Sequence, residues 1–209
     1  MASDVDICNL ALGHLGDEAA VSSINPPDQS AQAAYCSKFY SLALSMVLTD
    51  HDWQFAIKKA FLAQLPTSDA LWQYAYALPS DFMNVSALFA STSADDLNGL
   101  PATGSQVAYT IETDSNGNQV LYTNQFSPLL KYTAYVTNTA SFSPGFVEAL
   151  SWRLASYLAG PILKGDVGVA ASKTCMQMYA VALKAAKETD SQDRVVFPNY
   201  IPAGISARA

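Results

Sequence analysis

The most constraining feature of this sequence is a change in the spacing of its apolar residues along the chain. Near both ends they recur every three or four positions, which is the spacing of an amphipathic helix. In the middle, Trp72, Tyr74 and Tyr76 alternate with smaller or polar residues, as in a half-buried strand. The pattern predicts an α+β fold, in which a helical bundle formed from both ends of the chain carries an inserted antiparallel β-rich lobe.

The same pattern divides the chain into four segments. Residues 1–51 supply the N-terminal helices of the bundle and residues 52–140 the inserted lobe. Residues 141–190 supply the C-terminal helices, and residues 191–209 form an extended docking tail. The punctuation signals predict helices over residues 4–15, 29–49, 146–163 and 166–189.

Several residues sharpen the boundaries of these helices. Ser143 is a cap-type residue followed by proline, which suits the first turn of a helix. Gly160-Pro161 is expected to kink or end that helix, and Asp166 to cap the next one. The inward faces are expected to include Leu10, Val169 and Met178 together with the other apolar residues at helical spacing.

Within residues 52–140, alternation and turn chemistry predict the strands. Trp53, Phe55 and Ile57 alternate with other residues, which indicates a strand entering a sheet. Asn116-Gly117 favours a hairpin turn, because both residues readily adopt positive φ. The apolar content of Leu129–Val136 predicts a central strand, and the small polar residues of Ala90–Thr103 predict an exposed loop.

Composition and charge limit the partners that the chain can bind tightly. Half of the 209 residues are hydrophobic and only 14% are charged, which is enough apolar surface for a core and for a subunit interface. The net charge of −7, without a basic stripe, disfavours tight binding to nucleic-acid phosphates. An acidic wall can still line a passage that DNA crosses without sticking.

The sequence predicts no metal, no other cofactor and no membrane span. Cys8, Cys36 and Cys175 are far apart and lack a CxxC spacing, so buried free thiols are expected. The first residues lack the positive charge of a secretory signal, and the longest apolar stretch, Phe146–Leu163, contains two charged residues. Asp114–Asn118 lacks the length of a calcium loop and its closing glutamate.

Catalytic motifs are also missing, so we expect that the chain is not an enzyme. His14 has no nearby serine, cysteine or carboxylate partner in the sequence, and its place at a helix end suits the helix dipole. His51 lies between Asp50 and Asp52 like an acid–base cluster, but neighbouring residues do not face one another, which favours a solvated helix end. Glu148 is the only acid on an apolar helix face, and it lacks the second carboxylate that a glycosidase needs.

The last residues predict a docking segment. They combine large apolar side chains with two prolines that prevent a regular helix or a central strand. An apolar tail without a local period is typical of a segment that docks onto another molecule. The apolar residues that we expect to make this contact are Val195, Val196, Phe197, Tyr200 and Ile201.

Three motifs and the order of the elements resemble a known family. The motifs are NLALGHLG at residues 9–16, WQFA at residues 53–56 and YALPSDF at residues 76–82. With an intervening Ala-rich helix and a returning C-terminal helix, they resemble the phage tail tubular protein A family, the head-to-tail adaptors of short-tailed phages, over residues 4–190. The region around residues 90–118 departs most from the family pattern.

The resemblance implies a structural role in the tail of the virion. It implies a ring of twelve identical subunits seated between the portal protein and the tail nozzle protein, through which DNA passes without specific binding. It also implies that the C-terminal segment, here residues 195–205, docks on the portal. Two other functions stay open from the residues alone: a cell-wall-degrading tail glycosidase, and a carbohydrate- or protein-binding module of a virion.

Overall fold

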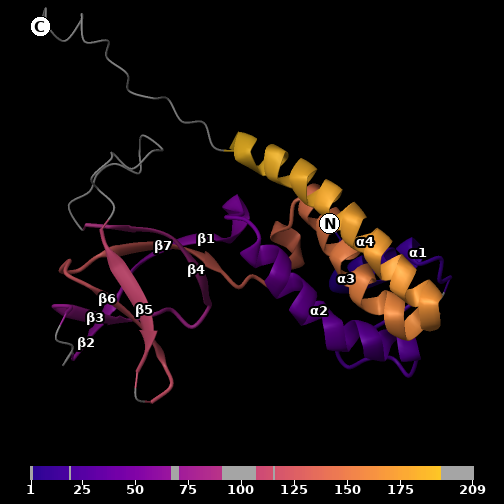
Figure 1. Ribbon diagram of the computed structural model, residues 1–209, viewed down its shortest axis with the longest axis horizontal. Coiled ribbons are helices and arrows are strands. Elements are labelled where there is room, and N and C mark those ends of the chain that lie inside the picture. Colours follow the sequence, from indigo (N-terminus) through magenta and orange to yellow (C-terminus); the bar gives the residue numbers. More distant parts are fainter. Residues whose placement is uncertain (1, 19, 67–70, 91–106, 115, 194–209) are drawn as a thin grey trace, which may run out of the picture. The chain divides into compact units, whose positions relative to one another are not determined.

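The computed structural model describes residues 2–18, 20–66, 71–90, 107–114 and 116–193. Within these ranges the fold is mixed, with four α-helices and two antiparallel sheets (Figure 1). The chain divides into two compact units, one made of Met1–Ala56 with Tyr135–Gln192 and the other built on Ile57–Ala134. The prediction that both helices and antiparallel strands are present is therefore confirmed.

The first unit contains the four helices, each close to its expected position. They are α1 (Asp4–His14), α2 (Ala31–Thr49), α3 (Pro144–Leu163) and α4 (Gly165–Asp190). Helix α3 packs against each of the other three and forms the centre of this unit. Its apolar residues fill the core of the unit, and Phe146, Leu150, Leu154 and Leu158 are completely buried.

The start of each of the first three helices follows from its capping residue. Ser3 and Asp6 form a reciprocal capping box at α1, and the Ser30 hydroxyl accepts the Ala33 N–H at 3.1 Å in α2. Ser143 accepts the N–H of Phe146 at 3.3 Å, and Pro144 is the first residue of α3. These bonds satisfy backbone donors that a helix otherwise leaves unpaired.

Helix α3 ends at Leu163, as predicted for the return helix, but the start of α4 differs from the prediction. Helix α3 continues through Pro161, which lies so near the C-terminus that few helical hydrogen bonds are disturbed. The chain reverses at Lys164 and Gly165, which have φ angles of 56° and 54°. Lys164 precedes α4, and the structure gives α4 no side-chain cap, so the prediction that Asp166 caps this helix is wrong.

Helices α3 and α4 pack closely because small residues line their contact. A Cβ atom built on Gly168 would lie 2.9 Å from the carbonyl oxygen of Ala159, and one built on Gly145 would lie 3.1 Å from Cβ of Ala186. Side chains that point away from α3 are exposed, and these include Val169 and Met178 of α4. The prediction that these two residues and Leu10 face inward is wrong.

The second unit contains two antiparallel sheets. One has the strand order β1-β7-β4, and the other has the order β2-β3-β6-β5. The strand formed by Leu129–Ala134, β7, is central in its sheet, as its apolar content predicts. The remaining strands are β1 (Ile57–Phe61), β2 (Ala63–Leu65), β3 (Tyr74–Ala77), β4 (Phe82–Phe89), β5 (Tyr109–Thr113) and β6 (Gln119–Thr123).

Two local predictions in this part of the chain have different outcomes. The hairpin between β5 and β6 is present: Gly117 has a φ of 84°, and the Asp114 carboxylate accepts the N–H groups of Asn116 and Asn118, both at 2.8 Å. The strand expected at residues 53–57 begins only at Ile57, because residues 54–56 form a 3-10 turn. Apart from Ala90, the predicted exposed loop lies outside the described residues.

Candidate functional site

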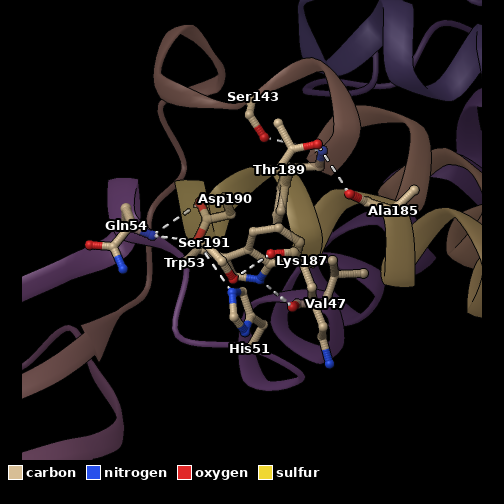
Figure 2. Close-up of polar contacts among 11 residues, drawn as sticks. Val47, His51, Trp53, Gln54, Ser143, Ala185, Lys187, Thr189, Asp190 and Ser191 are labelled. Atoms are coloured by element: carbon tan, nitrogen blue, oxygen red, sulfur yellow. Dashed lines mark hydrogen bonds and ion pairs between the residues drawn. The ribbon is translucent and has the colours of Figure 1, made fainter. Parts of the chain in front are cut away.

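A polar cluster joins the segment after α2 to the last residue of α4 (Figure 2). Asp190 is only 5% exposed. Its carboxylate accepts the backbone N–H of Gln54 at 3.2 and 3.3 Å, and Nε2 of His51 lies 3.2 Å from its Oδ2. A carboxylate at a helix C-terminus opposes the helix dipole, so these hydrogen bonds must stabilise its buried charge.

Trp53 fixes the turn that carries His51 and Gln54. Its side chain is fully buried, and its indole Nε1 donates a 2.8 Å hydrogen bond to the carbonyl of Val47 at the end of α2. The rings of His51 and Phe146 both meet it edge to face, each with centroids 5.0 Å apart. Phe55 also packs on Phe146, with centroids 4.9 Å apart. Trp53 and Phe55 therefore alternate with other residues because both pack on α3, and not because they belong to a strand.

A second contact ties α2 to α4 nearby. The Tyr179 hydroxyl donates a 2.5 Å hydrogen bond to Oδ2 of Asp50. Burial raises the pKa of Tyr179, and the hydrogen bond to Asp50 raises it further, so the phenol stays protonated. The Arg153 guanidinium lies 5.4 Å from the Tyr179 ring centroid and 5.0 Å from that of Tyr157.

The prediction of a solvated helix end holds for the exposed Asp50 and Asp52, but it missed the partners of Asp50 and His51 in α4. Both side chains bind residues of α4 that lie more than 120 positions away in the sequence. The carboxylates of Asp190 and Asp50 accept hydrogen bonds from Gln54 and Tyr179 of the same chain. The arrangement fastens the end of α2 to α4, which is a structural role.

His14 has a partner that the sequence did not reveal. Its Nε2 lies 3.0 Å from Oγ of Ser151, and its ring stacks on Trp152 with centroids 3.5 Å apart. The Ser151 hydroxyl donates to the carbonyl of Glu148 at 2.8 Å, so the imidazole N–H donates to Ser151. Burial lowers the pKa of His14, although the nearby Glu148 opposes this effect. Ser151 is completely buried and not activated as a nucleophile, so this pair packs α1 on α3.

The remaining acid considered for catalysis does not lie in an apolar environment. Glu148 is exposed on α3, whereas a glycosidase acid needs an environment that raises its pKa. All three cysteines are buried and free, as predicted. Among the described residues, no group of three His, Cys, Asp or Glu side chains could hold a metal ion.

A surface cavity of about 420 Å³ lies beside α1 and α2 in the first unit. Its lining contains the Asp4 carboxylate and several hydroxyl and amide groups, with no lysine or arginine, so it is unsuited to a phosphate group. The hydroxyl of Tyr40 is buried there and has no hydrogen-bond partner among the described residues. The lining consists of Asp4, Ile24, Asn25, Ser37, Tyr40, Ser41, Leu44, Tyr135 and Thr137.

Exposed apolar side chains gather on α4. Five of the twelve large hydrophobic residues found exposed belong to this helix, and Val167 and Val181 are 66% and 64% exposed. No helix in the described part of the chain is long and apolar enough to cross a membrane. Exposed apolar side chains on a helix are typical of a contact with another protein. The five residues lie on two sides of α4, with Val167, Met178 and Val181 on one side and Val169 and Met176 on the other.

The residues predicted to dock on a partner, Val195, Val196, Phe197, Tyr200 and Ile201, lie outside the described residues. The structure thus gives no position for the expected docking tail. No protein-family model and no curated protein sequence matches the chain.

Proposed function

We propose that this chain is the head-to-tail connector of a short-tailed phage, a non-enzymatic protein of the virion tail. It forms a ring, of twelve copies in the family that it resembles, between the portal and the tail nozzle, and DNA passes through this ring. The observation that carries the proposal is that one of the three motifs lies in α1 and the other two lie at junctions of the fold. NLALGHLG forms most of α1 and its end, WQFA the turn from α2 to β1, and YALPSDF the passage from β3 to β4.

The contacts of the WQFA motif explain why these four residues would recur together in proteins of one architecture. Trp53 is buried against α3, and the backbone of Gln54 is held by Asp190 of α4. A short segment with this many tertiary contacts tolerates few substitutions, because each change leaves a cavity or an unpaired group. The WQFA motif therefore supports the proposal that this chain shares its architecture with the family. Its support is stronger than that of a four-residue match without tertiary contacts.

The division of the chain supports the architecture that the resemblance implies. Helices from both ends of the chain belong to one unit, and residues 57–134 belong to the other. We propose that the four helices act as a bundle that forms the ring, and that the β unit is an insertion into it. The net charge of −7 fits a channel wall that repels DNA phosphates.

The docking tail gives the direct test of this function. Deleting residues 195–209 should leave the melting temperature nearly unchanged and abolish binding to the cognate portal protein, measured by co-sedimentation and electron microscopy. A control that lacks only residues 203–209 keeps all five apolar residues of the predicted contact and should still bind. Several buried side chains, each contributing roughly 1.5–3 kcal/mol before ordering costs, give tight attachment when they are repeated around a ring.

Three results would contradict the proposal. A chain without residues 195–209 that still binds the portal would exclude the tail as the attachment. Release of sugars from purified cell walls by the intact chain would favour the glycosidase alternative instead. Binding of the intact chain to a glycan, without binding to a portal, would favour the carbohydrate-binding alternative.

A further inference from the structure

The surface cavity beside α1 and α2 holds a buried polar group that the fold does not pair. The cavity measures about 420 Å³, within the range of about 300–1,000 Å³ that is usual for small-molecule sites. The Tyr40 hydroxyl is buried in its lining and has no hydrogen-bond partner among the described residues. A buried hydroxyl without a partner is unfavourable, so a ligand that reaches it gains a hydrogen bond without breaking one of the fold.

One side of α2 supplies both a polar and an apolar part of this cavity. Ser37, Tyr40, Ser41 and Leu44 follow one another at helical spacing, which places them on the same side of α2. The first three contribute hydroxyl groups, whereas Leu44 is buried, as is Ile24 of the preceding loop. The cavity therefore suits a ligand with one strongly polar group and a short hydrocarbon part.

Hydrogen bonds hold the loop before α2 in place without any ligand. The side-chain amide of Asn9 accepts the N–H of Val21 at 2.7 Å and donates to its carbonyl at 3.0 Å. The Asp28 carboxylate accepts the N–H of Ser22 at 2.8 Å. Because this wall of the cavity is already ordered, a ligand loses little binding free energy to the ordering of the protein.

The charge of the cavity is negative. Among the residues that line it, Asp4 is the only one with a charged side chain, and there is no lysine or arginine. Burial raises the pKa of Tyr40, and acidic neighbours that include Asp4 raise it further. The phenol is therefore neutral at neutral pH, and its oxygen is able to accept a hydrogen bond. A negative charge without a positive one beside it attracts a cation.

Other classes of ligand fit these groups less well. A phosphate or carboxylate is repelled by Asp4 and finds no cationic side chain in the lining. A metal ion needs several carboxylate, imidazole or thiolate ligands, and the lining offers one carboxylate. A neutral alcohol reaches the Tyr40 hydroxyl but gains no charge interaction from Asp4. An ammonium group uses both residues, and an aromatic ring beside it adds a cation–π contact.

We propose that this cavity binds a protonated primary amine on a short alkyl chain. The ammonium group donates a hydrogen bond to the Tyr40 oxygen and pairs with the Asp4 carboxylate, and the alkyl chain contacts Ile24 and Leu44. A free alkylamine and the lysine side chain of another protein share this chemistry. The proposal does not depend on the connector function.

The test is a titration of the full-length protein with n-butylamine at neutral pH, followed by calorimetry. The amine should saturate one site, and 1-butanol, which has a similar shape without the charge, should bind at least about tenfold more weakly. Tyr40→Phe should weaken amine binding by roughly tenfold, as expected for the loss of one hydrogen bond. Asp4→Asn should weaken it by a roughly similar factor, because the charge opposite the ammonium is lost.

Two variants serve as matched controls. Tyr35→Phe changes another half-buried tyrosine of α2 that does not line this cavity. Asp6→Asn removes a different acid from the first turn of α1, also outside the lining. Both should bind n-butylamine like the unmodified chain, and thermal melting establishes that all variants fold.

The melting temperature of Tyr40→Phe separates ligand binding from a role in folding. Without amine, this variant should melt at the same temperature as the unmodified chain or higher, because it loses a buried hydroxyl that has no partner. Saturating n-butylamine should raise the melting temperature of the unmodified chain and leave that of Tyr40→Phe nearly unchanged.

A second titration, with Nα-acetyl-lysine N-methylamide, distinguishes the two sources of the amine. Tighter binding of n-butylamine supports a free alkylamine as the ligand, and tighter binding of the lysine derivative supports a lysine side chain of another protein. Four results would overturn the proposal. These are the absence of saturable binding by either amine, equal binding of 1-butanol and n-butylamine, unchanged amine affinity in Tyr40→Phe, and a marked fall in the melting temperature of Tyr40→Phe.

Discussion

The contact between Asp190 and Gln54 makes a quantitative prediction about stability. Replacing Asp190 with alanine removes the acceptor of the Gln54 N–H and the partner of His51. An orphaned, partly buried donor costs about 1–3 kcal/mol, and hydrogen bonds to a charged group contribute about 1.5–3 kcal/mol. The side chain of His51 is 24% exposed, so water weakens the contribution of its contact with Asp190 to stability. We expect a loss of about 2–4 kcal/mol in the free energy of unfolding.

Two further variants isolate the cause of this loss. Asp190→Asn keeps an acceptor oxygen for Gln54 and removes the charge that opposes the dipole of α4, so its loss should be about 1 kcal/mol. Glu188→Ala removes an exposed acid one half-turn earlier and should change stability by less than about 0.5 kcal/mol. Urea unfolding, followed by the fluorescence of the buried Trp53, measures all three. If Asp190→Ala matches Glu188→Ala, the cluster does not hold α2 to α4 and the reasoning fails.

Two other predictions concern packing and pH. Gly168→Ala should destabilise the helical unit by about 1–3 kcal/mol in a thermal melt, because its Cβ would meet the Ala159 carbonyl at 2.9 Å. Gly13→Ala, in open space, should instead be neutral or stabilising by up to about 1 kcal/mol, and equal losses at both glycines would refute the argument. In the β unit, the 2.6 Å hydrogen bond from Lys58 is the main cause of the lowered pKa of Asp81. Its stabilising effect is therefore complete above the unfolded pKa of about 4 and is lost as pH falls through the lower folded value. Asp81→Asn should reduce the loss of stability at low pH, measured as unfolding midpoints between pH 2 and 6. An unchanged loss would mean that other acids cause it.

Short-range chemistry in the sequence predicts much of the local structure. Ser143 followed by Pro144 marks the start of α3, and Asn116-Gly117 marks the hairpin, because caps and turns depend on a few neighbouring residues. The high apolar content of residues 129–136 correctly predicts a central strand, since such a strand is buried on both faces. These signals need no knowledge of distant residues.

The errors arise where tertiary contacts decide the outcome. Trp53 and Phe55 alternate like strand residues, but both pack on Phe146, which lies about ninety positions later in the sequence. The partner of His51 is Asp190, and the partner of His14 is Ser151, each more than 130 residues away. Helical periodicity also identifies apolar residues without saying which side of the helix the chain buries, so it wrongly predicts that Val169 and Met178 face inward.

The position of Asp190 has a mechanical consequence for a protein that attaches through its C-terminus. Asp190 is the last residue of α4, and residues 195–209 follow it after four further residues. Tension applied to those residues would first reach the Asp190 carboxylate, which grips the backbone of Gln54 three residues before β1 begins. Part of the force would therefore pass from Asp190 to residue 54 through this hydrogen bond, without passing along α4. If the tail binds a portal as proposed, it would pull on an anchored point rather than on the free end of a helix.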